Sequence, residues 1–225
     1  MPESYNVELA HDLAHHGGAH GRRRDALLGM AEAIVLAIVA VATAWSGYQA
    51  SRWEGISTKH YALYERYTVL AQEKSTLAGQ DRLYDIVTFN GWTAAKMAGH
   101  EQLAAFYERR FRPEYDVAFK AWWRLDPLHD KTAPPGPIFM PQYKNANDLA
   151  VERYENVAAD YFKKGVETRD TGDDYVRVTV FLATVLFLTA LSQRFGYTGP
   201  RAIIVSIATL LLVISMFWIV TLPRT

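Results

Sequence analysis

Three long apolar stretches constrain this sequence more than any other feature. The first covers residues 26–50, and its most apolar part, Ala26–Tyr48, has 23 residues. A helix of that length rises about 34 Å, enough to cross the roughly 30 Å hydrocarbon core of a bilayer. The second covers residues 175–195 and the third residues 202–222, so only residues 196–201 join them. Such a short link forces an antiparallel hairpin. The sequence therefore predicts three transmembrane helices.

The chain that follows the first span has the pattern of a long helix. No proline occurs there until Pro113, and apolar residues recur every seven positions, which is typical of one face of a helix. The recurring positions are Ile56, Leu63, Leu70, Leu77 and Tyr84, joined by Val69, Leu83 and Val87.

Further helices are expected in the rest of the segment between the first two spans, residues 51–174. One opens at Glu101, the next at Pro113, and another runs from Asn147 toward Gly172, where the glycine favours a helix end. Residues 126–142 hold five of the nine prolines and form a loop. We therefore predict an all-α integral membrane protein with three transmembrane helices and an inserted extramembrane helical bundle.

Basic residues predict the orientation. Arg22, Arg23 and Arg24 precede the first span, and Arg194 and Arg201 flank the hairpin, so three spans place both groups on one side of the membrane. That side is expected to be cytoplasmic. Basic residues just beyond the first span oppose this orientation only weakly, because long translocated segments largely escape the charge rule. The N-terminus is then cytoplasmic and residues 51–174 are extracytoplasmic.

An alternative is that the first apolar stretch is a cleaved signal. The tripeptide Ala42-Thr43-Ala44 matches a small-residue cleavage site. An acidic residue inside the apolar run, Glu32, counts against it. We therefore expect the stretch to be retained as a membrane anchor.

The two ends of the chain are short. Residues 1–25 read as a flexible tail because of their glycines, and residues 223–225 form the C-terminal end. The tail contains an H-x3-HH-x3-H pattern whose imidazoles are weak candidate ligands for a transition metal. A solvated tail is the favoured interpretation, since nothing is positioned to fix a ligand geometry. The four histidines are His11, His15, His16 and His20.

One acidic residue lies within the spans. Glu32 would sit roughly 9 Å into the first helix, where an isolated charge is costly, so it should have a partner. With the orientation above, Gln193 and Arg194 lie at the same face of the membrane. Structural pairing and ion conduction are the two interpretations, and a single acidic residue favours pairing.

The first span also carries a seam of small residues at spacings of three and four. Small side chains let backbones approach closely, and in lipid this packing replaces the hydrophobic effect. The seam can hold the hairpin of the same subunit or a second subunit. Its members are Gly29, Ala33, Ala37, Ala40, Ala44, Gly47 and Ser51. A bulky face suited to lipid contains Ile34, Ile38, Val41 and Trp45.

Composition and motifs argue against most chemistries. The 24 basic side chains are balanced by 24 acidic ones, which gives no excess positive charge for nucleic acid. The absence of cysteine excludes disulfides, thiol nucleophiles and thiolate-bound metals. No phosphate-binding loop, dinucleotide fingerprint, nucleophile elbow or H-E-x-x-H motif is present. We expect a non-enzymatic protein without a cofactor.

Several fragments resemble a family of uncharacterised bacterial membrane proteins. The likeness lies in ATAWSGYQASRWEG at Ala42–Gly55, in RFRPEYDVAFKAW at Arg110–Trp122, and in later DPL, AP and PQY fragments. It implies a bacterial inner membrane, three spans and a helical extramembrane domain. The resemblance assigns no functional residue.

The expected function follows from this architecture. A bundle carried on membrane helices without catalytic motifs is typical of a scaffold or assembly protein that forms a homo-oligomer or joins a membrane complex in lipid. An extracytoplasmic ligand sensor is the alternative, although no cytoplasmic output domain is recognisable. An oligomeric ion channel is a third interpretation.

Overall fold

The computed structural model describes residues 26–197 and 199–225 with their side chains, and residues 3–25 and 198 by their backbone. The chain is 82% helical, and its described part contains no strand. Helix α1 begins at Glu3, so the backbone of residues 3–25 is helical and the glycines there do not interrupt it. The histidines of this segment, His11, His15, His16 and His20, lie outside the described side chains. The helices are α1 (Glu3–Met97), α2 (Glu101–Glu108), α3 (Pro113–Trp123), η1 (Pro137–Phe139), α4 (Ala146–Ser192) and α5 (Thr198–Thr221).

Three of these helices are long and apolar enough to cross a membrane. They lie in Ala26–Met97, Ala146–Ser192 and Gly199–Thr221. The predictions of an all-helical chain and of three apolar helices are therefore confirmed. The chain divides into two compact units, with unit 1 made of Met1–Lys59 and Lys164–Thr225 and unit 2 of His60–Lys163.

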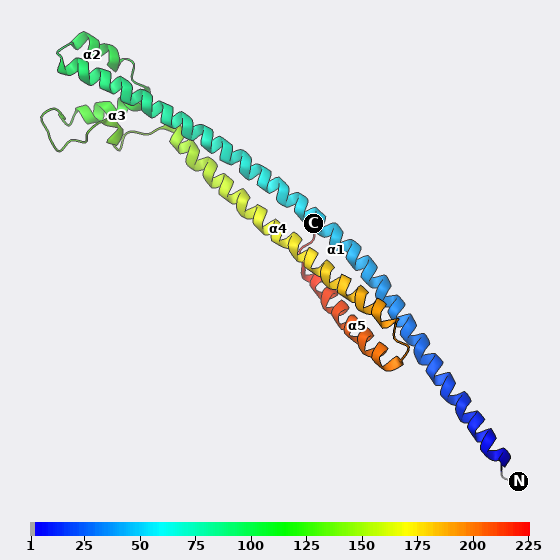
Figure 1. The fold of residues 1–225 in the computed structure, drawn as a ribbon. Helices are drawn as coiled ribbons and strands as arrows, with labels where there is room; N and C mark the ends of the chain where they lie inside the picture. The colour runs from blue at the N-terminus through cyan, green and yellow to red at the C-terminus, as the bar shows by residue number, and fades with distance from the viewer. Residues whose placement is uncertain (1–2) are drawn as a thin grey trace. The chain divides into compact units, whose positions relative to one another are not determined.

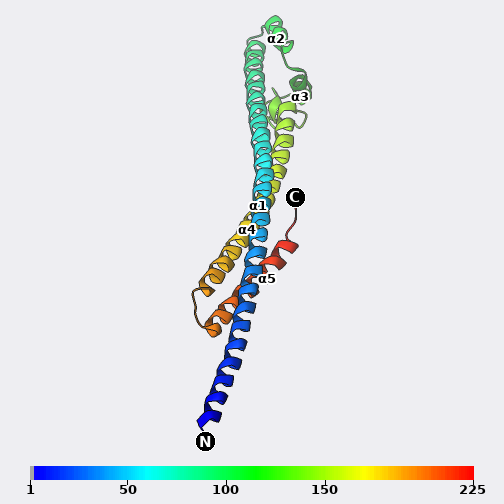
Figure 2. The same ribbon diagram turned by 90° about the vertical axis from the view of Figure 1, so that its right-hand side faces the viewer.

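Unit 1 is a bundle of three helices, in which α1, α4 and α5 lie side by side (Figures 1 and 2). Its core is aliphatic and includes Val39, Leu182 and Leu212. Between helices that cross a membrane, such a core would be held by close van der Waals packing. The buried face of α1 follows spacings of three and four, as packed helices require. It comprises Glu32, Val35, Val39, Ala42, Ser46 and Gln49.

Helix α4 runs without interruption through Gly172, so the predicted helix end at this glycine is wrong. A Cβ at position 172 would lie 3.4 Å from Trp53 Cβ and 3.6 Å from the Ala50 carbonyl oxygen. The glycine therefore allows α1 and α4 to approach each other inside unit 1. It serves helix packing rather than helix termination.

Unit 2 consists of the end of α1, the short helices α2 and α3, the proline-rich loop and the start of α4. An aromatic cluster forms its core, with the Trp92 and Phe119 rings 4.9 Å apart and nearly perpendicular. The proline-rich loop packs on this core, because Met140 is buried and Trp122 Nε1 donates a hydrogen bond of 2.7 Å to the Pro134 carbonyl. Phe139, in the same loop, is 62% exposed.

Candidate functional site

Groups that could bind a metal ion do not converge in the described chain. Among residues 26–197 and 199–225, no three His, Asp or Glu side chains are grouped as a metal ion would require. His60 packs against the Tyr161 ring, with the centroids 6.3 Å apart. His129 is exposed and pairs with Asp126 over 2.9 Å. Neither histidine belongs to a group of three metal-binding side chains in the described part of the chain.

Glu32 lies in unit 1 and is almost completely buried, with 2% of its surface exposed. Arg201 donates from Nε to Glu32 Oε1 over 2.8 Å and from Nη2 to Oε2 over 2.7 Å. Ser192 Oγ donates a third hydrogen bond to Oε1 over 2.9 Å. The carboxylate is thus neutralised and hydrogen-bonded on both oxygens, which favours a structural role for the pair.

We expected Arg194 or Gln193 as the partner of Glu32, and the structure pairs it with Arg201 instead. Arg194 and Gln193 follow the end of α4 and are exposed. Arg201 lies in the first turn of α5 beside Gly29, where a Cβ would be 3.9 Å from the guanidinium.

A second buried ion pair organises unit 2. The fully buried Asp85 accepts hydrogen bonds from Arg112 Nε over 3.0 Å and from Arg112 Nη2 over 2.7 Å. Tyr143 Oη also donates to Asp85, and Arg112 contacts Asp81 at 3.2 Å. The hydrogen bonds to Asp85 raise the pKa of Arg112 above its ordinary value, and burial raises that of Tyr143. The guanidinium of Arg112 is therefore engaged inside the chain.

The small-residue seam faces outward. Gly29 is half-buried, and the other six members, Ala33, Ala37, Ala40, Ala44, Gly47 and Ser51, are exposed in the single chain. This exposure does not support the interpretation in which the seam packs against the hairpin of its own subunit. An entirely apolar pocket of about 440 Å³ adjoins it. This pocket is lined by Ala37, Ile38, Val41, Ala42, Trp45, Met216 and Ile219.

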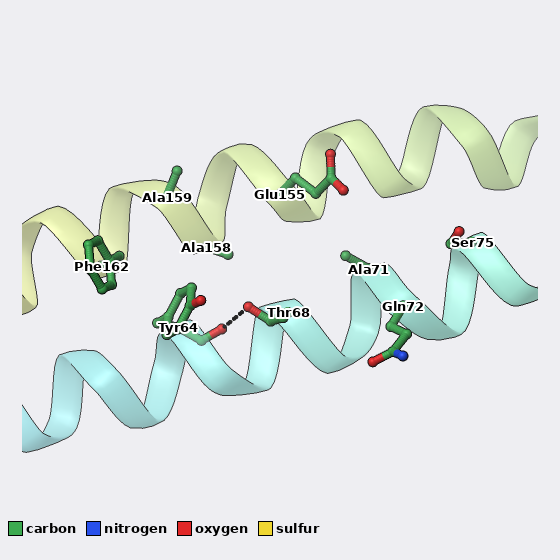
Figure 3. Close-up of a pocket in the computed structure, with 9 residues that line it drawn as sticks. All are labelled: Tyr64, Thr68, Ala71, Gln72, Ser75, Glu155, Ala158, Ala159 and Phe162. Atoms are coloured by element: carbon green, nitrogen blue, oxygen red, sulfur yellow. Dashed lines mark hydrogen bonds between the residues drawn. The ribbon is translucent and has the colours of Figure 1, made fainter.

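A groove of about 580 Å³ lies between α1 and α4 in unit 2 (Figure 3). It exists because the contact positions Ala71 and Ala158 are small. The Tyr64 and Phe162 rings close one end, 5.3 Å apart, and polar side chains form the walls. The polar lining residues are Thr68, Gln72, Ser75 and Glu155.

The predicted heptad positions of α1 are not its most buried positions in unit 2. Leu63, Leu70 and Leu77, which we call the leucine stripe, are only half-buried, and Tyr84 is 45% exposed. The buried positions lie one residue later, at Ala71, Ala78 and Asp85. Val69, Leu83 and Val87, expected to join the same face, are all exposed.

A smaller pocket of about 270 Å³ lies where the end of α1 meets α2 and α3. Its aromatic wall is formed by Trp92, Phe119 and Trp123. Lys96 pairs with Glu101 over 2.8 Å and lies 5.9 Å from the centre of the Trp123 ring. The pocket combines an apolar surface with charges of both signs.

Comparison with protein-family models, with curated proteins and with solved structures finds no match for this chain.

Proposed function

We propose that this chain is a non-enzymatic membrane scaffold or assembly protein that acts as a homo-oligomer or as an accessory subunit of a membrane complex. The observation that carries this proposal is the outward-facing seam of α1. Six small residues on one helix are left exposed beside an apolar pocket. Small exposed residues on a membrane helix favour close contact with another helix, because in lipid that contact depends on packing.

The proposal places the chain in a bacterial inner membrane with its N-terminus in the cytoplasm. Residues 51–174 then form an inserted extracytoplasmic helical bundle. Support comes from the arginines before the first span and around the hairpin, and from the family resemblance described above. The Glu32–Arg201 pair supports a structural rather than a conducting role for the one buried carboxylate of the first span.

The test is the mass of the full chain in lipid nanodiscs, measured for the wild type and for Ala37→Leu combined with Ala40→Leu. We expect a wild-type oligomer, alone or with a co-purifying membrane partner, that dissociates in the double variant. The matched control is Ala183→Leu combined with Ala190→Leu, which adds the same volume at exposed positions of α4. A monomeric wild type without a partner contradicts the proposal.

An extracytoplasmic ligand sensor is the second candidate, and the pocket beside Trp92 and Trp123 favours it. Its volume of about 270 Å³ suits only a small ligand. A small molecule that co-purifies with the wild type and is lost on Trp123→Ala would support sensing over assembly.

A further inference from the structure

The apolar pocket of unit 1 lies between α1 and α5. Its volume is about 440 Å³, and its lining is entirely apolar. Ile38, Val41 and Trp45 of α1 form one wall and are exposed, and Met216 and Ile219 of α5 form the other. Both helices are apolar and long enough to cross a membrane. In a bilayer this pocket would therefore be filled by hydrocarbon.

The side of α1 that forms this wall continues to a cation. Ile38, Trp45 and Arg52 recur every seven residues, so they lie on one side of the helix. Tyr48 lies between the last two, with its ring 6.1 Å from that of Trp45, and such aromatic rings are typical of the membrane–water interface. Arg52 is four residues, or about 6 Å, beyond Tyr48, and a headgroup region is about 5 to 8 Å thick. Arg52 is thus placed at the depth of lipid headgroups.

A second arginine is held beside the same part of α1. Trp53 Nε1 donates a hydrogen bond of 3.3 Å to the Pro223 carbonyl, and Thr225 Oγ1 donates one of 2.9 Å to Gln49 Oε1. Arg224 therefore lies between two residues that are anchored to α1. Like the first arginine it is exposed, and in the described part of the chain neither guanidinium makes an ion pair.

We propose that the apolar pocket and these two arginines bind one anionic phospholipid, with an acyl chain in the pocket and the phosphate on Arg52 and Arg224. Along α1 the apolar wall, the aromatic rings and the cation follow the order of chain, interface and headgroup in such a lipid. A guanidinium donates paired hydrogen bonds to a phosphate. A zwitterionic lipid carries an ammonium group that offsets its phosphate, so two arginines favour a lipid of net negative charge. This inference goes beyond the proposed function, because a single chain forms the whole site.

Native mass spectrometry of the full chain tests the headgroup part of the site. Detergent micelles that contain the chain receive either phosphatidylglycerol or phosphatidylcholine with the same acyl chains. We expect the wild type to retain at least about fivefold more phosphatidylglycerol, since one basic residue near a membrane surface is worth about that factor. Arg52→Gln should remove most of this preference. The matched control is Arg194→Gln, which removes an exposed charge beside the α4–α5 loop and should keep the preference.

The same measurement tests the acyl-chain part. Val41 lines the pocket and is 72% exposed, so Val41→Trp should fill the pocket and reduce the retention of both lipids. Val180→Trp is the matched control, because Val180 is 62% exposed on α4, which contributes no residue to the pocket lining.

Three results would overturn the proposed lipid site. They are equal retention of the two lipids by the wild type, an equal loss of preference in Arg52→Gln and Arg194→Gln, and an equal loss of lipid in Val41→Trp and Val180→Trp. The nanodisc mass of the wild type is measured independently of these results. An oligomeric mass without lipid preference therefore leaves the proposed function standing, and a monomeric mass with the expected preference leaves the lipid site standing.

Discussion

Arg201 holds the buried carboxylate of Glu32 with two hydrogen bonds, of 2.8 and 2.7 Å, from the first turn of α5. The two residues are 169 positions apart in sequence, and their pair joins α1 to α5. Because Glu32 is 3% and Arg201 20% exposed at their side chains, the charges are largely removed from water. Removing one partner alone leaves the other charge without compensation.

We therefore predict that Glu32→Ala lowers the free energy of unfolding by about 1 to 3 kcal/mol, because Arg201 loses both hydrogen bonds. Glu32→Gln should cost less, since the amide oxygen still accepts one bond. Glu32→Ala combined with Arg201→Leu should recover part of the loss, because no charge then remains buried. Detergent-denaturation curves measure all three. Cation flux into liposomes that disappears with Glu32→Gln would contradict the structural role.

Burial of tyrosines predicts loss of stability at alkaline pH. Burial raises the pKa of Tyr143 above its ordinary value of 10, and burial likewise raises that of the fully buried Tyr115. Above about pH 10 the unfolded chain loses these protons while the folded chain keeps them, so the free energy of unfolding falls as pH rises. The slope is up to about 1.4 kcal/mol per pH unit for each tyrosine.

The measurement is the thermal midpoint of the full chain between pH 8 and about pH 11. Tyr143→Phe should reduce the alkaline slope while lowering the midpoint at pH 8, since the phenylalanine cannot donate to Asp85. Tyr197→Phe is the control, because Tyr197 is 80% exposed and lies in the hairpin between the second and third apolar helices. An equal effect of both substitutions on the slope would show that Tyr143 does not contribute.

Two glycines of α1 should respond oppositely to alanine. A Cβ at Gly91 would lie 2.5 Å from two ring atoms of Tyr107, whereas one at Gly79 would meet nothing within 4 Å. Alanine in a helix gains about 0.5 to 1 kcal/mol over glycine, so Gly79→Ala should stabilise the chain. Gly91→Ala forces the Tyr107 ring to move and should be less stable than Gly79→Ala by about 1 to 2 kcal/mol. Chemical denaturation measures both, and Gly91→Ala combined with Tyr107→Ala should abolish the difference.

The apolar helices were predictable from sequence because hydropathy over 20 residues depends on no tertiary contact. The partner of Glu32 was harder to predict. The cost of burying Glu32 required a polar partner, but Arg194 and Arg201 both flank the hairpin. Only the structure shows that Arg201, on α5, is directed toward Glu32 on α1. Gly172 shows the same difficulty, since a glycine signals either a helix end or a close helix contact.

The most buried face of α1 in unit 2 does not follow from the apolar heptad for a related reason. Two patterns at helical spacing run along this helix one residue apart, and the more apolar one contains Leu63, Leu70 and Leu77. Packing with α4 uses the other, because small residues such as Ala71 and Ala158 permit close approach and Asp85 reaches Arg112. Hydrophobicity alone therefore indicated a face of the helix that a single chain does not fully bury.

The final prediction concerns the proposed orientation in the membrane. Thr58 and Gly196 are both exposed. Thr58 follows the apolar part of α1, and Gly196 lies in the loop that joins α4 to α5. With the N-terminus inside, Thr58→Cys should react with an impermeant maleimide added to intact cells, and Gly196→Cys should react only after lysis. Thr58 is preferred to Ser57, which is buried and donates a hydrogen bond to the Gly165 carbonyl. The comparison of intact with lysed cells controls for intrinsic reactivity. Labelling of Gly196→Cys from outside, with Thr58→Cys protected, would invert the orientation and with it the extracytoplasmic assignment of residues 51–174.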